Sequence, residues 1–99
     1  MWVKRRSYVR KHPEPSDVLL LIEVAESSLD ADRGEKLELY AEALIAEYWI
    51  VNLVDQVIEV YRQPQGQSFQ SCRVFRVGDT IAPLALPQAL LPVEHLFPT

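Results

Sequence analysis

The chain has 99 residues, 48% of them hydrophobic, and a formal net charge of −4 at pH 7. That length allows one small domain, the apolar content excludes a disordered chain, and the negative charge argues weakly against broad nucleic-acid binding. The longest apolar run, Val18–Ile22, is far below the roughly 20 residues of a membrane helix, and no signal-peptide core follows the start MWVKRR; we therefore expect a cytoplasmic protein without membrane association.

Residues 1–16 are expected to form a basic arm and an extended connector that ends in HPEPSD. Half of all Lys and Arg lie here, whereas ten of the fourteen acids lie between Glu14 and Glu47. The arm could bind nucleic-acid phosphates, or it could simply be solvated terminal charge, which is the more usual case. Its candidate nucleic-acid-binding residues are Lys4, Arg5, Arg6, Arg10 and Lys11.

A buried strand is predicted from Asp17 to Ala25, because both of its faces are apolar except at Glu23. The segment SSLDAD reads as a loop, and Asp32 with Glu35 has capping-box spacing. A helix is predicted from there to about Leu44, with an apolar stripe that faces the core.

Two further buried strands, EYWIVNL and QVIEVYR, are close enough in sequence to form a hairpin. Since the first two strands flank a helix, they should be parallel. The stretch SFQSCRVFRVGDTI predicts one more strand with a turn at Gly78–Asp79, and VEHLF a short terminal helix. The predicted fold is α/β or α+β, a mixed sheet in a single domain with its core at 17–82 and a Pro-rich tail at 83–99.

The sequence lacks several common chemical motifs. Its three glycines are not clustered, so no phosphate-binding loop is present. Neither His12 nor His95 has a second ligand at metal-binding spacing, which argues against a zinc site. The remaining candidates for a functional site are carboxylate and lysine side chains.

Burial of the Glu23 carboxylate without a partner would destabilise the folded protein. Glu23 is either a residue at the open rim of the strand or a metal ligand in a cleft at the strand's carboxyl end. Lys36 follows about one turn into the helix, beside Leu37 at the border of the buried stripe. It either reaches toward Glu23, where an ammonium would position water or stabilise charge on a phosphate, or extends to solvent as many border lysines do.

The stretch DVLLLIEVAESSLDADRGEKLELYAEALIAEYWIVNLVDQVIEVYR closely resembles the Uma-two (Uma2) family, restriction-endonuclease-like proteins formerly grouped as a domain of unknown function. The resemblance covers about residues 2–97 and is carried by IEVAESS, DRGEK, LYA and EYWIVN. It implies a PD-(D/E)XK site that holds Mg²⁺ or Mn²⁺ between an Asp and an acid on the next strand, with a lysine alongside.

The resemblance assigns roles to four residues. Glu23 corresponds to the second acid, and Lys36 to a catalytic lysine displaced into the helix. The backbone carbonyl of Val24 would be a further metal ligand. Asp32 would act chiefly as a helix cap, with an indirect role behind the metal ligands.

The chain also departs from the family pattern. The family's first acid lies upstream of the region matching Trp2, so this chain resembles the C-terminal portion of a family domain. Asp17 cannot replace that acid, because it lies roughly 20 Å along the same strand from Glu23. Leu44 and Ala46 stand where a Gly and often a Pro end the helix, which is expected to lengthen or distort that junction.

The sequence therefore leaves two alternative functions. One is a Mg²⁺-dependent endonuclease that cleaves DNA, feebly active or inactive without the first acid. The other is a non-catalytic remnant or interaction module whose incomplete sheet edge favours self-association as a homodimer.

Overall fold

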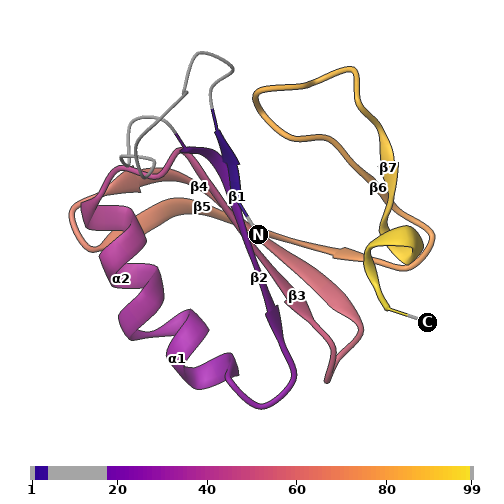
Figure 1. Ribbon diagram of the computed structural model, residues 1–99, viewed down its shortest axis with the longest axis horizontal. Coiled ribbons are helices and arrows are strands. Elements are labelled where there is room, and N and C mark those ends of the chain that lie inside the picture. The colour runs from indigo at the N-terminus through magenta and orange to yellow at the C-terminus, as the bar shows by residue number, and fades with distance from the viewer. Residues whose placement is uncertain (1, 5–17, 99) are drawn as a thin grey trace.

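The computed structural model describes residues 2–4 and 18–98, which build a mixed β-sheet with helices on one face (Figure 1). The main sheet has five strands in the order β1-β2-β3-β4-β5. The elements are β1 (Trp2–Lys4), β2 (Val18–Ala25), α1 (Leu29–Arg33), α2 (Glu35–Glu42), β3 (Glu47–Asn52), β4 (Val57–Gln65), β5 (Ser68–Arg76), β6 (Thr80–Ile81), β7 (Leu91–Pro92) and a 3-10 helix (Val93–Leu96). The predicted mixed α+β architecture is confirmed.

The strand pairing follows the sequence prediction. β2 and β3 are parallel and are joined by the helix pair, while β3, β4 and β5 form antiparallel hairpins. The register places Glu23 beside Ile50, Ile50 beside Glu59, and Glu59 beside Val74. Paired residues project to the same face, so these four side chains form one row across the sheet.

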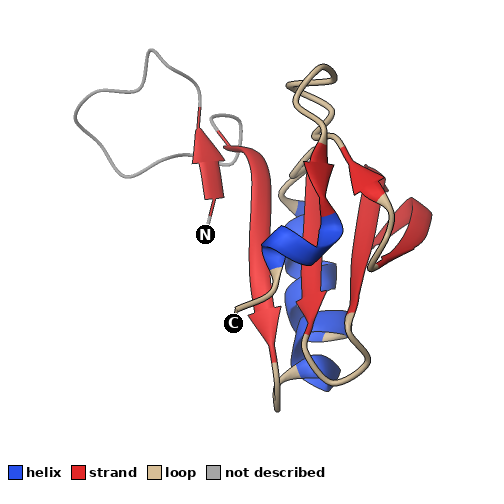
Figure 2. Ribbon diagram, turned by 90° about the vertical axis from the view of Figure 1, so that its right-hand side faces the viewer, coloured by secondary structure: helices blue, strands red, loops and turns tan. Residues whose placement is uncertain are grey.

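The two faces of the sheet are covered by different segments (Figure 2). On one face, Tyr48 and Ile50 pack against Leu37 and other apolar side chains of α1 and α2. On the opposite face, Trp49 and its neighbours pack against Val93 and other residues of the C-terminal segment. β2 contributes to both clusters, as its two apolar faces predict.

A buried carboxylate fastens the C-terminal segment to the sheet. Glu47 accepts hydrogen bonds from Trp49 Nε1, Arg62 Nε and the backbone N–H of Leu84, each at 2.8 Å. Arg62 also donates to the carbonyl of Ala82 at 2.8 Å. Because the charge of Glu47 is fully buried, this set of donors is what makes its burial tolerable.

The predicted single helix is wrong in two respects: it begins earlier, at Leu29, and it is interrupted at Gly34. Gly34 has φ −103° and ψ −104°, outside the helical region. A Cβ at this position would lie 2.8 Å from the carbonyl oxygen of Asp30. The close approach of the two backbone segments therefore requires glycine.

Of the two outcomes expected at Leu44 and Ala46, lengthening is wrong, because α2 ends at Glu42, whereas the junction is distorted at Leu44. The N–H of Leu44 donates to the carbonyl of Ala41 and the N–H of Ile45 to that of Tyr40, both at 3.0 Å. These are the two bonds of a Schellman motif, which normally has glycine at the position of Leu44. Leu44 instead adopts the left-handed conformation itself, with φ 59°.

Candidate active site at the end of strand β2

Glu23 lies two residues before the carboxyl end of β2, on the face covered by the helix pair. Its neighbours on that face, Leu21 and Ala25, belong to the apolar cluster beneath the helices. The side chain of Glu23 is 25% exposed. It is therefore neither a freely solvated rim residue nor a fully buried charge.

Lys36, the second residue of α2, reaches back to Glu23. Its Nζ donates a hydrogen bond to Glu23 Oε2 at 2.7 Å and lies 3.0 Å from Asp32 Oδ1. The predicted convergence of Glu23 and Lys36 is confirmed. The contact with Glu23, and to a smaller extent that with Asp32, raises the pKa of Lys36 well above its ordinary value.

Asp32 is almost fully buried, and its predicted role as a helix cap is wrong. α1 begins at Leu29 with Ser28 as the capping residue, so Asp32 lies inside the helix. Its Oδ2 accepts a hydrogen bond from Ser28 Oγ at 2.8 Å, and its backbone carbonyl accepts one from Tyr48 Oη at 2.9 Å. Among the described residues Oδ1 has no partner other than the ammonium of Lys36, 3.0 Å away.

The carbonyl of Val24 is oriented away from β3. The next carbonyl, that of Ala25, accepts the N–H of Leu53 at 2.9 Å and so points toward β3. Successive carbonyls alternate between the two edges of a strand, which directs that of Val24 to the other edge. The described part of β1 pairs with β2 only as far as Leu21, so it does not cover this carbonyl.

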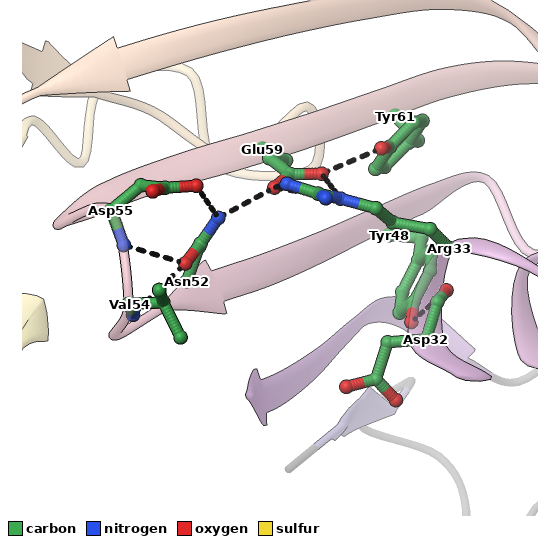
Figure 3. A network of polar contacts seen from close by, with 8 residues as sticks. All are labelled: Asp32, Arg33, Tyr48, Asn52, Val54, Asp55, Glu59 and Tyr61. Carbon is green, nitrogen blue, oxygen red and sulfur yellow. Dashed lines mark hydrogen bonds and ion pairs between the residues drawn. The ribbon is translucent and has the colours of Figure 1, made fainter. Parts of the chain in front are cut away.

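A second polar network, which the sequence analysis missed, lies on the same face (Figure 3). Glu59 is only 4% exposed and accepts hydrogen bonds from Arg33 Nε, Asn52 Nδ2 and Tyr61 Oη. Burial raises the pKa of Glu59, but hydrogen bonds from Arg33, Tyr61 and Asn52 outweigh it and lower the pKa overall. The sequence did contain a signal for a buried acid at this position, because VIEVY surrounds Glu59 with apolar residues just as LIEVA surrounds Glu23.

Other predicted residues fall outside the part of the chain that can be described. Arg5, Arg6, Arg10 and Lys11 lie outside the described residues, and of Lys4 only the backbone, in β1, is described. Across residues 2–4 and 18–98, no group of three or more His, Cys, Asp or Glu could hold a metal ion. No helix in the same ranges is long and apolar enough to cross a membrane.

Comparison with known proteins supports the resemblance read from the sequence. The model of the Uma2 family, described as "Putative restriction endonuclease", matches residues 1–94. No curated protein and no solved structure matches the chain. The family match spans almost all of the 99 residues and includes the acid-centred strand, the helix entry and the hairpin. The chain therefore belongs to the Uma2 family of restriction-endonuclease-like proteins.

Proposed function

We propose that this chain hydrolyses phosphodiester bonds of DNA with the help of Mg²⁺ or Mn²⁺ bound at the carboxyl end of β2. The observation that carries the proposal is the 2.7 Å contact between Lys36 Nζ and Glu23 Oε2, with Asp32 beside them. A carboxylate and an ammonium so arranged are the groups that a metal-assisted phosphoryl reaction needs. Family membership points to the same chemistry.

The residues present fit a hard divalent cation. Of the two carboxylate oxygens of Glu23, only Oε2 contacts Lys36. The other, Oε1, makes no hydrogen bond with the described residues and can bind a metal ion. The carbonyl of Val24, on the edge of β2 that the described part of β1 leaves uncovered, supplies a second oxygen. Mg²⁺ is commonly held by one or two carboxylates together with substrate phosphate and water, so these donors suit it when DNA is present. When bound, the ion would polarise the phosphate and acidify a water molecule.

Lys36 acts as a cation. Its Nζ lies within 3.0 Å of the carboxylates of both Glu23 and Asp32, which favour its charged form. A fixed ammonium stabilises the negative charge that develops on the phosphate oxygens. Asp32 Oδ1 also lies 3.0 Å from Lys36 Nζ, and Ser28 and Tyr48 in turn hold Asp32 by hydrogen bonds.

The test is Mg²⁺-dependent nicking of supercoiled DNA by wild type, Glu23→Gln and Lys36→Ala. We expect each variant to lose about 100-fold or more in rate, the usual effect of removing one group that stabilises the transition state. Glu26→Gln is the matched control, since Glu26 is exposed and lies just beyond β2. Equal rates in all four proteins would remove Glu23 and Lys36 from catalysis.

Metal binding can be measured separately from turnover. Crystals soaked in Mn²⁺ should show anomalous density beside Glu23 and the carbonyl of Val24. Because no third acid joins Glu23 and Asp32 among the described residues, we expect weak binding without DNA. Density elsewhere, with none near Glu23, would contradict the assigned ligands.

A second candidate, a non-catalytic module that self-associates as a homodimer, draws support from the edge of the sheet. β5 is the last strand of the sheet order and spans nine residues, and such an edge can pair with another chain. Sedimentation velocity tests the dimer, and a monomer at all concentrations would overturn it. The cytoplasmic location stays a prediction.

A further inference from the structure

A pocket of about 730 Å³ opens on the helix-covered face of the sheet, at its β4–β5 side. Its lining includes Arg33 from α1, Val57 and Glu59 from β4, and Val74 and Arg76 from β5. Val57 pairs with Arg76 and Glu59 with Val74, so all four strand residues project to the face that carries Glu23. The pocket and the candidate active site thus share one face.

Arg33 enters this pocket in a fixed orientation. Its Nε and one terminal nitrogen donate to both oxygens of Glu59, which is itself held by Asn52 Nδ2 and Tyr61 Oη at 3.0 and 2.8 Å (Figure 3). The side chain of Arg33 is nevertheless 44% exposed. The buried carboxylate therefore orients a guanidinium whose outer N–H groups still face the pocket.

Arg76 brings a second guanidinium that no side chain of residues 18–98 engages. Residues 18–98 contain five Lys and Arg. Lys36, Arg33 and Arg62 form ion pairs, and Arg73 lies over the ring of Phe75 at 5.2 Å. The side chain of Arg76 forms neither kind of contact with the described residues, although it lines the pocket. Its donors are available to a ligand.

The two acids that line the pocket, Glu59 and Asp55, do not prevent it from attracting an anion. The charge of Glu59 is offset by Arg33 in a bidentate pair. Asp55 accepts a hydrogen bond from Asn52 Nδ2 at 3.0 Å and carries the remaining negative charge of the lining. The lining thus holds one guanidinium oriented by Glu59 and a second, that of Arg76, without a partner among the described residues, beside one unneutralised carboxylate. Guanidinium groups match the oxygens of phosphate in geometry, so this lining suits a single anionic group.

We propose that this pocket binds a backbone phosphate of the DNA whose cleavage is proposed at Glu23, and the inference rests on that proposed function. Glu23 and Glu59 lie in one row of the sheet, separated by a single strand, so their Cα atoms are about 10 Å apart. One DNA molecule can therefore contact both places. The pocket would fix the position of the duplex, while the reaction takes place at Glu23.

The test measures DNA binding without cleavage. Fluorescence anisotropy with a short labelled duplex, in EDTA, compares Arg76→Ala with Arg73→Ala. The two arginines lie three residues apart on β5, and both are exposed. Arg73 pairs with Val60 and so projects to the opposite face. Neither arginine forms an ion pair among the described residues, so both variants should fold.

Loss of one phosphate contact should weaken binding by Arg76→Ala about tenfold and lower the slope of log K against log salt by about 1, while Arg73→Ala behaves as wild type. Asp55→Asn should tighten binding, because it removes a negative charge from the lining and can still accept from Asn52. Equal affinities for Arg76→Ala, Arg73→Ala and wild type would overturn the inference.

The failure of this inference and that of the proposed function can be told apart. If Glu23→Gln abolishes nicking while Arg76→Ala binds DNA as wild type does, the catalytic proposal stands and the phosphate pocket is wrong. If Arg76→Ala alone weakens binding but no protein nicks DNA, the pocket stands and the hydrolytic proposal is wrong. If wild type binds no DNA at all, both are wrong.

Discussion

Replacing Leu44 by glycine should make the protein more stable. Leu44 has φ 59°, a left-handed conformation that costs a residue with a Cβ about 1–2 kcal/mol. Glycine avoids that cost but loses about 0.5–1 kcal/mol more entropy on folding. The Leu44 side chain is 67% exposed, so its removal forfeits little apolar burial. We expect a net gain of about 1 kcal/mol in the free energy of unfolding.

Urea denaturation followed by circular dichroism measures this change, and thermal melting should show a rise of about 4–8 °C for a domain of this size. Leu44→Ala is the control, because it removes the same exposed side chain and keeps the Cβ. We expect Leu44→Ala to match wild type within about 0.5 kcal/mol. If Leu44→Gly were no more stable than Leu44→Ala, the strain assigned to this helix end would not exist.

Two further predictions concern the elements around the site. Gly34→Ala should lower the free energy of unfolding by about 1–3 kcal/mol, because its Cβ would meet the Asp30 carbonyl oxygen; an unchanged urea midpoint would contradict this. Folding lowers the pKa of the Glu59 carboxylate below its ordinary value of 4.5. The charged carboxylate therefore stabilises the fold at pH values above 4.5, and this stabilisation is lost as the pH falls through the folded-state pKa. The stability difference between wild type and Glu59→Gln should therefore shrink between about pH 7 and about pH 3, and a constant difference would contradict the sign.

The sequence predicted the contact between Glu23 and Lys36 because that contact depends on local connections. A helix that follows a strand by a short loop returns over the end of the strand, so the first turns of the helix approach its carboxyl end. The parallel pairing of β2 with β3 and the hairpin of β3 with β4 follow from the same short connections. The catalytic roles of Glu23 and Lys36 stay predictions.

The second network was not predicted because its partners are distant in sequence. Arg33 and Glu59 are separated by 26 residues and meet only once the helix pair lies across β4. A strand pattern does not identify which cation will neutralise a buried acid. Asp32 was misassigned for a related reason. Several residues of SSLDAD could stand at the start of a helix, and the structure places Ser28 at the N-cap position, without a side-chain capping bond, and Asp32 inside the helix, where its carbonyl accepts a hydrogen bond from Tyr48.

The interruption at Gly34 explains how two cations so close in sequence serve different carboxylates. Arg33 and Lys36 are three residues apart and would share one face of an unbroken helix. Here Arg33 reaches Glu59 on β4 and Lys36 reaches Glu23 on β2, on opposite sides of β3. The ψ of −104° at Gly34 turns α2 relative to α1 and so separates their directions. A single glycine thus divides the helix into one part that positions Lys36 for the proposed reaction and another that positions Arg33 for the proposed phosphate contact.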